Sequence, residues 1–197
     1  MKKSPWGLGL ILAALVGMDQ ASGQSRVVIE RVCPEIDSGR FAIKRVVRES
    51  VTVEADIFAD GHDLVAAEVL YRPAQDEDWQ RLPMKSIGND RWRGEFRVSE
   101  IGPYLYTVEG WVDRFGTWLS NMTKRINAGQ EISIDCRIGA GLLADAALRA
   151  ATEDAARLRA WARTLGDEDS GQDGKQIILG DDLAAIVKRY PDRCFAT

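Results

Sequence analysis

Catalytic chemistry in this sequence would have to come from very few side chains. The one histidine, His62, lies in the polar stretch Asp60–Asp63. A general base needs a partner that holds it in place, and no such partner is evident, so we interpret His62 as a turn residue. A single histidine also excludes a metal site built from several histidines.

The cysteines do not indicate a metal centre either. Cys33, Cys136 and Cys194 lie far apart in the sequence and form no CxxC pair. An odd number of widely spaced cysteines favours neither a zinc site nor a disulfide framework. We expect three free or buried thiols.

Acidic residues occur in close pairs, Glu35 with Asp37 and Asp60 with Asp63. Carboxylates are so common on surfaces that spacing alone does not identify a glycosidase pair, and we interpret these as turn and cap residues. The sequence has no GxSxG motif and no glycine-rich phosphate loop. We therefore predict no catalytic, cofactor-binding or metal-binding residue, and no cofactor.

Aromatic side chains could stack on sugar rings. Trp92, Tyr104 and Tyr106 fall at inward positions of alternating segments, which favours a role in the core. Trp111 and Trp118 are the better candidates for an interface or a sugar-stacking surface.

The stretch Gly88–Trp118 organises the elements that would position these side chains. Arg91–Val98 alternates between apolar and charged residues, as a half-buried strand does. In Tyr104–Asp113 one face has Tyr104, Tyr106, Val108 and Val112, and the opposite face has Leu105, Thr107, Glu109 and Trp111. Ser99–Pro103 between them contains Gly102 and Pro103, which predicts a hairpin connection. Because two antiparallel strands are not stable alone, flanking segments must complete the sheet.

Further short strands precede this pair. We predict them at Arg26–Cys33, Ser50–Phe58, Leu64–Tyr71 and Trp79–Met84, with a short apolar segment at Phe41–Val47. In Ser50–Phe58, the inward residues are Val51, Val53, Ala55 and Ile57. Regular short strands separated by polar turns indicate an immunoglobulin- or fibronectin-like antiparallel β-sandwich over residues 26–113.

Beyond Asp113 the apolar residues fall at helical spacing. We predict helices at Arg114–Ala128, Gly139–Ala151, Glu153–Leu165 and Asp181–Tyr190, with Thr152 as the N-cap of the third. The stretch Glu131–Arg137 fits a strand or a helix, and Gly166–Lys175 is a polar loop. Apolar helix positions that need a partner are Leu148, Leu158, Trp161, Leu165, Leu183, Ile186 and Val187. We expect an α+β fold in which residues 114–197 form a truncated helical insertion, an incomplete subdomain.

The first 25 residues differ from the rest. Lys2 and Lys3 precede the apolar run Trp6–Met18 and a group of small residues, which is the form of a secretory signal. The run is shorter than the roughly 20 apolar residues of a membrane-spanning helix, so we expect no stable membrane insertion. A start codon placed too early, or a disordered extension, is the alternative.

A net charge of −4 without a basic run gives no reason to expect a nucleic-acid partner.

Several long motifs, in one order, resemble a single family. They are RVVIERVCPEIDSGRFAIKRVVRE, VTVEADIFADGHD, GNDRWRGEF, YTVEGWVDRFGTW and the closing YPDR. They are similar to the N-terminal region of bacterial α-1,4-glucan:maltose-1-phosphate maltosyltransferases, from about Arg26 to the end of the chain.

The resemblance implies an enzyme that transfers maltosyl units from maltose 1-phosphate to α-1,4-glucans, releasing phosphate, with retention through a glycosyl-enzyme intermediate. The α-amylase-like barrel of that family lies C-terminal to this region, so its catalytic Asp and Glu residues have no counterpart here. Its N-terminal domain resembles a β-sandwich with a helical insertion that helps to form a homodimer. The phosphosugar is cytosolic, which implies a cytoplasmic protein.

Three hypotheses follow. The first is an accessory and dimerisation region that meets α-glucan and maltose 1-phosphate only through the absent barrel. The second is a carbohydrate-binding β-sandwich module without catalytic activity, with Trp111 and Trp118 as its stacking residues. The third is an exported binding protein, should Met1–Gly23 be a real signal.

Overall fold

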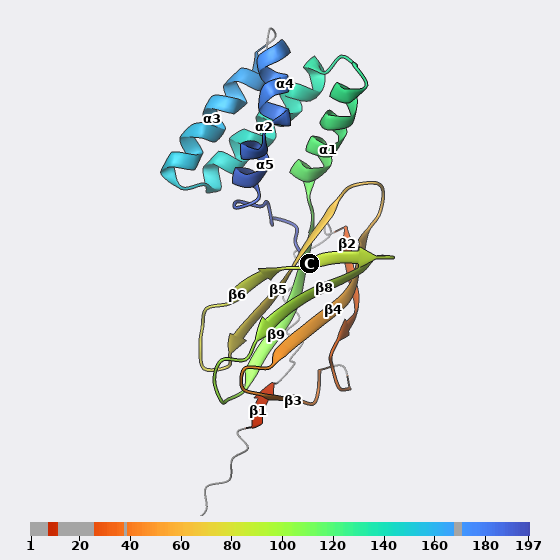
Figure 1. Cartoon of the computed structure of the whole chain (residues 1–197), viewed down its shortest axis with the longest axis vertical. Coiled ribbons are helices and arrows are strands. Elements are labelled where there is room, and N and C mark those ends of the chain that lie inside the picture. Colours follow the sequence, from red (N-terminus) through yellow and green to blue (C-terminus); the bar gives the residue numbers. More distant parts are fainter. Residues whose placement is uncertain (1–7, 12–25, 38, 168–170) are drawn as a thin grey trace, which may run out of the picture. The chain divides into compact units, whose positions relative to one another are not determined.

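The computed structural model describes residues 8–11, 26–37, 39–167 and 171–197, which form two compact units (Figure 1). One unit extends up to Val112 and also includes Phe195–Thr197, whereas the other comprises Asp113–Cys194. The expectation for Met1–Gly23 lies outside the described residues, except at Leu8–Ile11, which form a strand. Among the described residues, no helix combines the length and the apolar character that crossing a membrane requires.

The first unit is a sandwich of two β-sheets, as predicted. A five-stranded sheet has the order β3-β1-β9-β5-β6, and a four-stranded sheet has the order β2-β4-β8-β7. The strands are β1 (Leu8–Ile11), β2 (Val27–Cys33), β3 (Ile43–Val46), β4 (Ser50–Ala59), β5 (Val65–Pro73), β6 (Gln80–Pro83), β7 (Lys85–Gly88), β8 (Arg91–Arg97) and β9 (Tyr104–Val112). Pairing is antiparallel throughout, except where β1 meets β9 in parallel through Ile11 and Tyr104.

Alternation in the strands builds the core between the sheets. Val51, Val53, Ala55 and Ile57 of β4 are all buried, as predicted, and they share one cluster with Tyr104, Tyr106 and Val108 of β9. The ring of Phe96 in β8 stacks on Tyr71 of β5, with 4.4 Å between ring centroids. Burying each large apolar side chain contributes about 1.5–3 kcal/mol, so this shared cluster stabilises the unit.

The predicted hairpin between Arg91–Val98 and Tyr104–Asp113 is wrong. β8 pairs with β4 and β7, whereas β9 pairs with β5 and β1 in the opposite sheet. The largely exposed connection Ser99–Pro103 leads from one sheet to the other, and the Tyr104 hydroxyl accepts hydrogen bonds from the backbone N–H groups of Ser99 and Glu100, at 3.3 and 3.1 Å. Two strands with one apolar face each can pair side by side or face each other across a core, and alternation does not distinguish these arrangements.

The predicted strand Trp79–Met84 is also wrong in part. The chain forms β6 in one sheet, passes through the buried Met84, and continues as β7 in the other sheet. β7 then turns into β8 through Asn89 and Asp90, whose φ values of 49° and 59° suit a tight hairpin turn.

The described residues of the second unit form five helices. They are α1 (Arg114–Asn127), α2 (Ser133–Arg149), α3 (Thr152–Gly166), α4 (Gly171–Leu179) and α5 (Asp181–Val187) (Figure 1). The Asp113 carboxylate caps α1 by accepting a hydrogen bond from the Gly116 N–H at 2.8 Å. Gly129, with a φ of 67°, follows the end of α1. The ambiguous stretch Glu131–Arg137 resolves as a helix from Ser133 onward.

Three details of the helical predictions need correction. Thr152 is the first residue of α3 rather than its N-cap; Ala151 holds that position, and no side chain caps the helix. The predicted loop Gly166–Lys175 contains the start of α4. Helix α5 ends at Val187, before the predicted Tyr190.

The apolar helix positions find partners within this unit, contrary to expectation. Leu158, Leu165, Leu183, Ile186 and Val187 are buried in one cluster, and Trp161 packs against it. Leu148 differs, because its side chain remains 79% exposed.

The end of the chain returns to the sandwich. The backbone N–H and carbonyl of Thr197 bond to those of Gly110 in β9, at 2.9 and 3.1 Å, and the Thr197 hydroxyl donates to the Val27 carbonyl at 2.8 Å. The chain thus leaves the sandwich after Val112 and rejoins it at Phe195.

Candidate functional site

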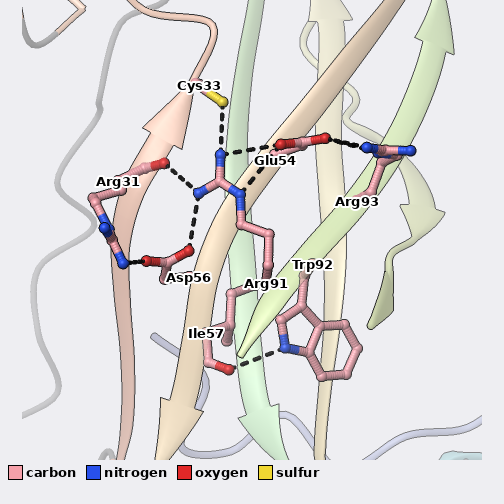
Figure 2. A network of polar contacts seen from close by, with 8 residues as sticks. All are labelled: Arg31, Cys33, Glu54, Asp56, Ile57, Arg91, Trp92 and Arg93. Atoms are coloured by element: carbon pink, nitrogen blue, oxygen red, sulfur yellow. Dashed lines mark hydrogen bonds and ion pairs between the residues drawn. The ribbon is translucent and has the colours of Figure 1, made fainter. Parts of the chain in front are cut away.

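Among the described residues, a dense group of polar contacts lies on the four-stranded sheet, where β2, β4 and β8 run side by side (Figure 2). We call it the Arg91 cluster, and its members are Arg31, Cys33, Glu54, Asp56, Arg91 and Arg93. The register of β4 and β8 places Asp56 opposite Arg91 and Glu54 opposite Arg93. Directly opposed residues of opposite charge stabilise a strand pair.

Arg91 is the centre of the cluster. Its Nε and Nη2 donate to Glu54 Oε2, each at 3.2 Å, and its Nη1 donates to Asp56 Oδ1 at 3.0 Å. Nη1 also reaches the Arg31 carbonyl at 3.1 Å, and Nη2 lies 3.0 Å from Cys33 Sγ. A guanidinium has five N–H donors, so these contacts occupy all of them.

The contact with the Arg31 carbonyl has a structural cause. The pairing of β2 with β4 shifts register between Glu30 and Cys33, and Arg31 has a φ of 49°. A β-bulge of this kind leaves backbone groups without ladder partners. Arg91 supplies a donor to one of them, so a side chain of β8 reaches across β4 to fasten the edge strand β2.

Both carboxylates are held in their ionised forms. Hydrogen bonds from Arg93 and then Arg91 lower the pKa of Glu54, and the hydrogen bond from Arg91 lowers the pKa of Asp56 despite burial. Asp56 is 6% exposed and also forms an ion pair with Arg31. A catalytic carboxylic acid needs the opposite shift, toward the working pH. The cluster therefore fastens three strands with ionised carboxylates and offers no neutral carboxylic acid as a proton donor.

The two tryptophans predicted as stacking residues have little exposed surface. Trp118 is 7% exposed, its indole N–H donates to the Asp135 carbonyl at 2.8 Å, and it belongs to the helical cluster. Trp111, on β9, is 6% exposed. A sugar-stacking platform needs an open ring face, so these two positions offer little support for one.

The other candidate residues occupy turns or packed positions. His62 is exposed, and its neighbours Asp60 and Asp63 accept hydrogen bonds from Arg26 at 2.7 and 2.8 Å. Cys33 is half-buried, Cys136 is buried and Cys194 is exposed, and no disulfide joins these three. Within the described ranges, no group of three or more His, Cys, Asp or Glu residues lies close enough to hold a metal ion.

Alternation in the sequence places Arg91 and Arg93 on the polar side of a predicted strand and does not single out Glu54 or Asp56. A usable signal was present, since two acids at i and i+2 of one predicted strand match two arginines at i and i+2 of another. The register that brings them together depends on which strands are neighbours.

Comparison with known proteins gives a consistent result. Residues 25–197 match the family model described as "Alpha-1,4-glucan:maltose-1-phosphate maltosyltransferase, domain N/S". The chain is 44% identical over 190 residues to the maltosyltransferase of Chlorobaculum tepidum, covering 95% of this chain and 28% of that protein. It is 41% identical over 177 residues to the one from Myxococcus xanthus, covering 86% of this chain and 27% of that protein. The chain thus spans roughly a quarter of the length of these relatives.

Proposed function

Because the chain belongs to the family of α-1,4-glucan:maltose-1-phosphate maltosyltransferase N/S domains, we propose that it is the N-terminal accessory and dimerisation region of such an enzyme. The whole enzyme transfers maltosyl units from maltose 1-phosphate to α-1,4-glucans and acts in the cytoplasm. The observation that carries this proposal is the match of residues 25–197 to the N/S domain of this family, in a chain that spans only 28% and 27% of two relatives named maltosyltransferase.

The arrangement of charged groups supports an accessory role. Glu54 and Asp56 are held by arginines and have lowered pKa values. Asp60 and Asp63 are bound by Arg26. Carboxylates held in this way stabilise the fold, which is the role expected of an accessory region.

An activity assay tests this role directly. The purified 197-residue chain is incubated with maltose 1-phosphate and a glycogen acceptor, and released phosphate is measured. The control is a full-length relative under identical conditions. We expect release from the control alone, and release by this chain would contradict the proposal.

A binding assay separates the carbohydrate-binding alternative. Electrophoresis through a gel containing glycogen should leave the mobility of this chain unchanged. Retardation that the Trp111→Ala variant abolishes would favour the carbohydrate-binding module instead.

A further inference from the structure

Strand β9 is paired completely on one side and incompletely on the other. Its residues Tyr104–Val112 pair with β5 along the whole length of the strand. On the opposite side, Tyr104 pairs with Ile11 of β1, and Gly110 exchanges two backbone hydrogen bonds with Thr197. Among the described residues, this side of β9 is therefore bordered only near the two ends of the strand.

We define the β9 edge as the stretch Tyr104–Gly110 on this side. Backbone N–H and C=O groups alternate in direction along a strand, so those of Tyr106 and Val108 point to the side on which Gly110 bonds Thr197. No described strand pairs with Tyr106 or Val108 there. Both residues are nonetheless buried, at 3% and 8% exposed. Buried backbone groups are normally paired, and an edge strand with unpaired groups is a template for an added strand.

Strand β1 occupies one end of the β9 edge, and its pairing there is short. It has four residues, Leu8–Ile11, with Gly9 inside the strand. It pairs antiparallel with β3 at all four positions but meets β9 at one parallel position, Ile11 with Tyr104. Glycine inside a strand weakens it, and parallel pairing is slightly less stable than antiparallel pairing. The family match over residues 25–197 contains β3 and β9 but not β1. The β9 edge thus belongs to the matched region, whereas its occupant does not.

We propose that the β9 edge is a strand-acceptor site, to which an extended peptide with apolar residues at alternate positions adds as a new strand and displaces β1. The pairing of β1 shows which chemistry the site accepts. Ile11 pairs with Ile43 on one side and Tyr104 on the other, and both partners belong to the core. Directly paired residues share a face of a sheet, so an apolar residue suits this position. The main chain of the added peptide also supplies hydrogen bonds to Tyr106 and Val108, with which β1 does not pair.

A disulfide lock tests whether β1 occupies this place. Leu10 pairs with Lys44 of β3, and Lys44 is exposed. Paired Cα atoms of antiparallel strands lie about 4.5–5.5 Å apart, within the roughly 4.4–6.8 Å that a disulfide spans. The double variant Leu10→Cys with Lys44→Cys should therefore close an intramolecular disulfide on mild oxidation. Its background carries Cys33→Ser and Cys194→Ser. The matched control combines Leu10→Cys with Gln80→Cys on β6, three strand spacings or about 14 Å away, and should close at least tenfold more slowly.

The same lock tests the acceptor site. The probe is a fluorescein-labelled peptide, GLGLILKK in one-letter code, which repeats residues 7–12 and adds two lysines for solubility. Fluorescence polarisation should show binding to the reduced Leu10→Cys, Lys44→Cys chain. Binding to the oxidised chain should be at least tenfold weaker, because a locked β1 cannot leave the site. The control peptide GLGLDLKK, with aspartate in place of isoleucine, should bind the reduced chain at least tenfold more weakly, since burying an unpaired charge is costly.

Hydrogen exchange measured by mass spectrometry gives a second readout that does not depend on cysteine. On the unmodified chain, the peptide should increase protection in Tyr104–Gly110 and decrease it in Leu8–Ile11. Equal rates of disulfide closure in the two double variants would overturn the pairing of β1. Equal binding of the peptide to the oxidised and reduced chains, or binding to neither, would overturn the acceptor site.

Discussion

The outer face of the four-stranded sheet and the outer face of α2 differ in how many of their side chains have contacts within the chain. On β4 and β8, Glu54, Asp56, Arg91 and Arg93 meet partners of opposite charge. The donors of Arg91 are all occupied. On α2, large apolar side chains stand in solvent although the opposite face of the same helix is packed. Charge pairing across neighbouring strands thus holds the polar side chains of the cluster, whereas the packing of the helical unit uses only one face of α2 and leaves the other uncovered.

The largest expected effect concerns the two cores. Phe96→Ala should lower the free energy of unfolding of the sandwich by about 3–5 kcal/mol, and Leu158→Ala should lower that of the helical unit by about 2–5 kcal/mol. Both side chains are fully buried, and the two clusters share no residue. Hydrogen exchange measured by mass spectrometry should show lost protection only in the unit that carries the substitution. Equal loss in both units would mean that they fold as one.

A second pair of substitutions compares the two faces of α2. Gly139→Ala should destabilise the helical unit by about 1–3 kcal/mol, because its methyl group collides with Trp118. Gly141→Ala should stabilise the monomer by about 1 kcal/mol through helix propensity. Denaturant unfolding at low protein concentration measures both. Destabilisation by Gly141→Ala in the monomer would show that the chain itself requires that glycine.

The smallest expected effect is the pH dependence of the Arg91 cluster, whose members are partly solvated. The pKa values of Glu54 and Asp56 are lowered in the folded chain, so their contribution to stability is fully present above the unfolded pKa values of about 4. It is lost as the pH falls through the folded values. The urea midpoint should drop between about pH 5 and pH 3, and Arg91→Met should flatten that drop.

Arg97→Met provides the matched control for this experiment. Arg97 lies on the same strand, is exposed and stands outside the cluster. This variant should keep the pH dependence of the unmodified chain. A flattened profile in the control as well would assign the effect to net charge.

The sequence predicted features that depend on neighbours along the chain. Alternation placed the inward residues of β4 and the buried Tyr104 and Tyr106 correctly, because a pleated strand has a strict period. Helical spacing located α1 because an α-helix also has a fixed period. It missed α4 (Gly171–Leu179) altogether, because Gly171 and Gly174 weaken the helical pattern.

Features that depend on distant partners were not predictable in the same way. The false hairpin between β8 and β9 arose because alternation reveals a buried face and not the neighbouring strand. The Arg91 cluster was missed for the same reason, since it exists only once β4 lies between β2 and β8. Leu158 and Leu183 were expected to lack partners because a helical pattern does not reveal which helices fold back on one another.

The two backbone hydrogen bonds between Thr197 and Gly110 affect how this chain tolerates insertions and deletions. The segment Asp113–Cys194 begins and ends at the sandwich, so in polymer terms it is a closed loop. The entropy of closing a loop grows only with the logarithm of its length, and doubling the length costs about 0.6 kcal/mol. The folding free energy of the sandwich therefore depends only weakly on the number of residues in this segment. Descendants of this sequence could lengthen, shorten or replace the helices at little thermodynamic cost, provided that the two junctions stay together.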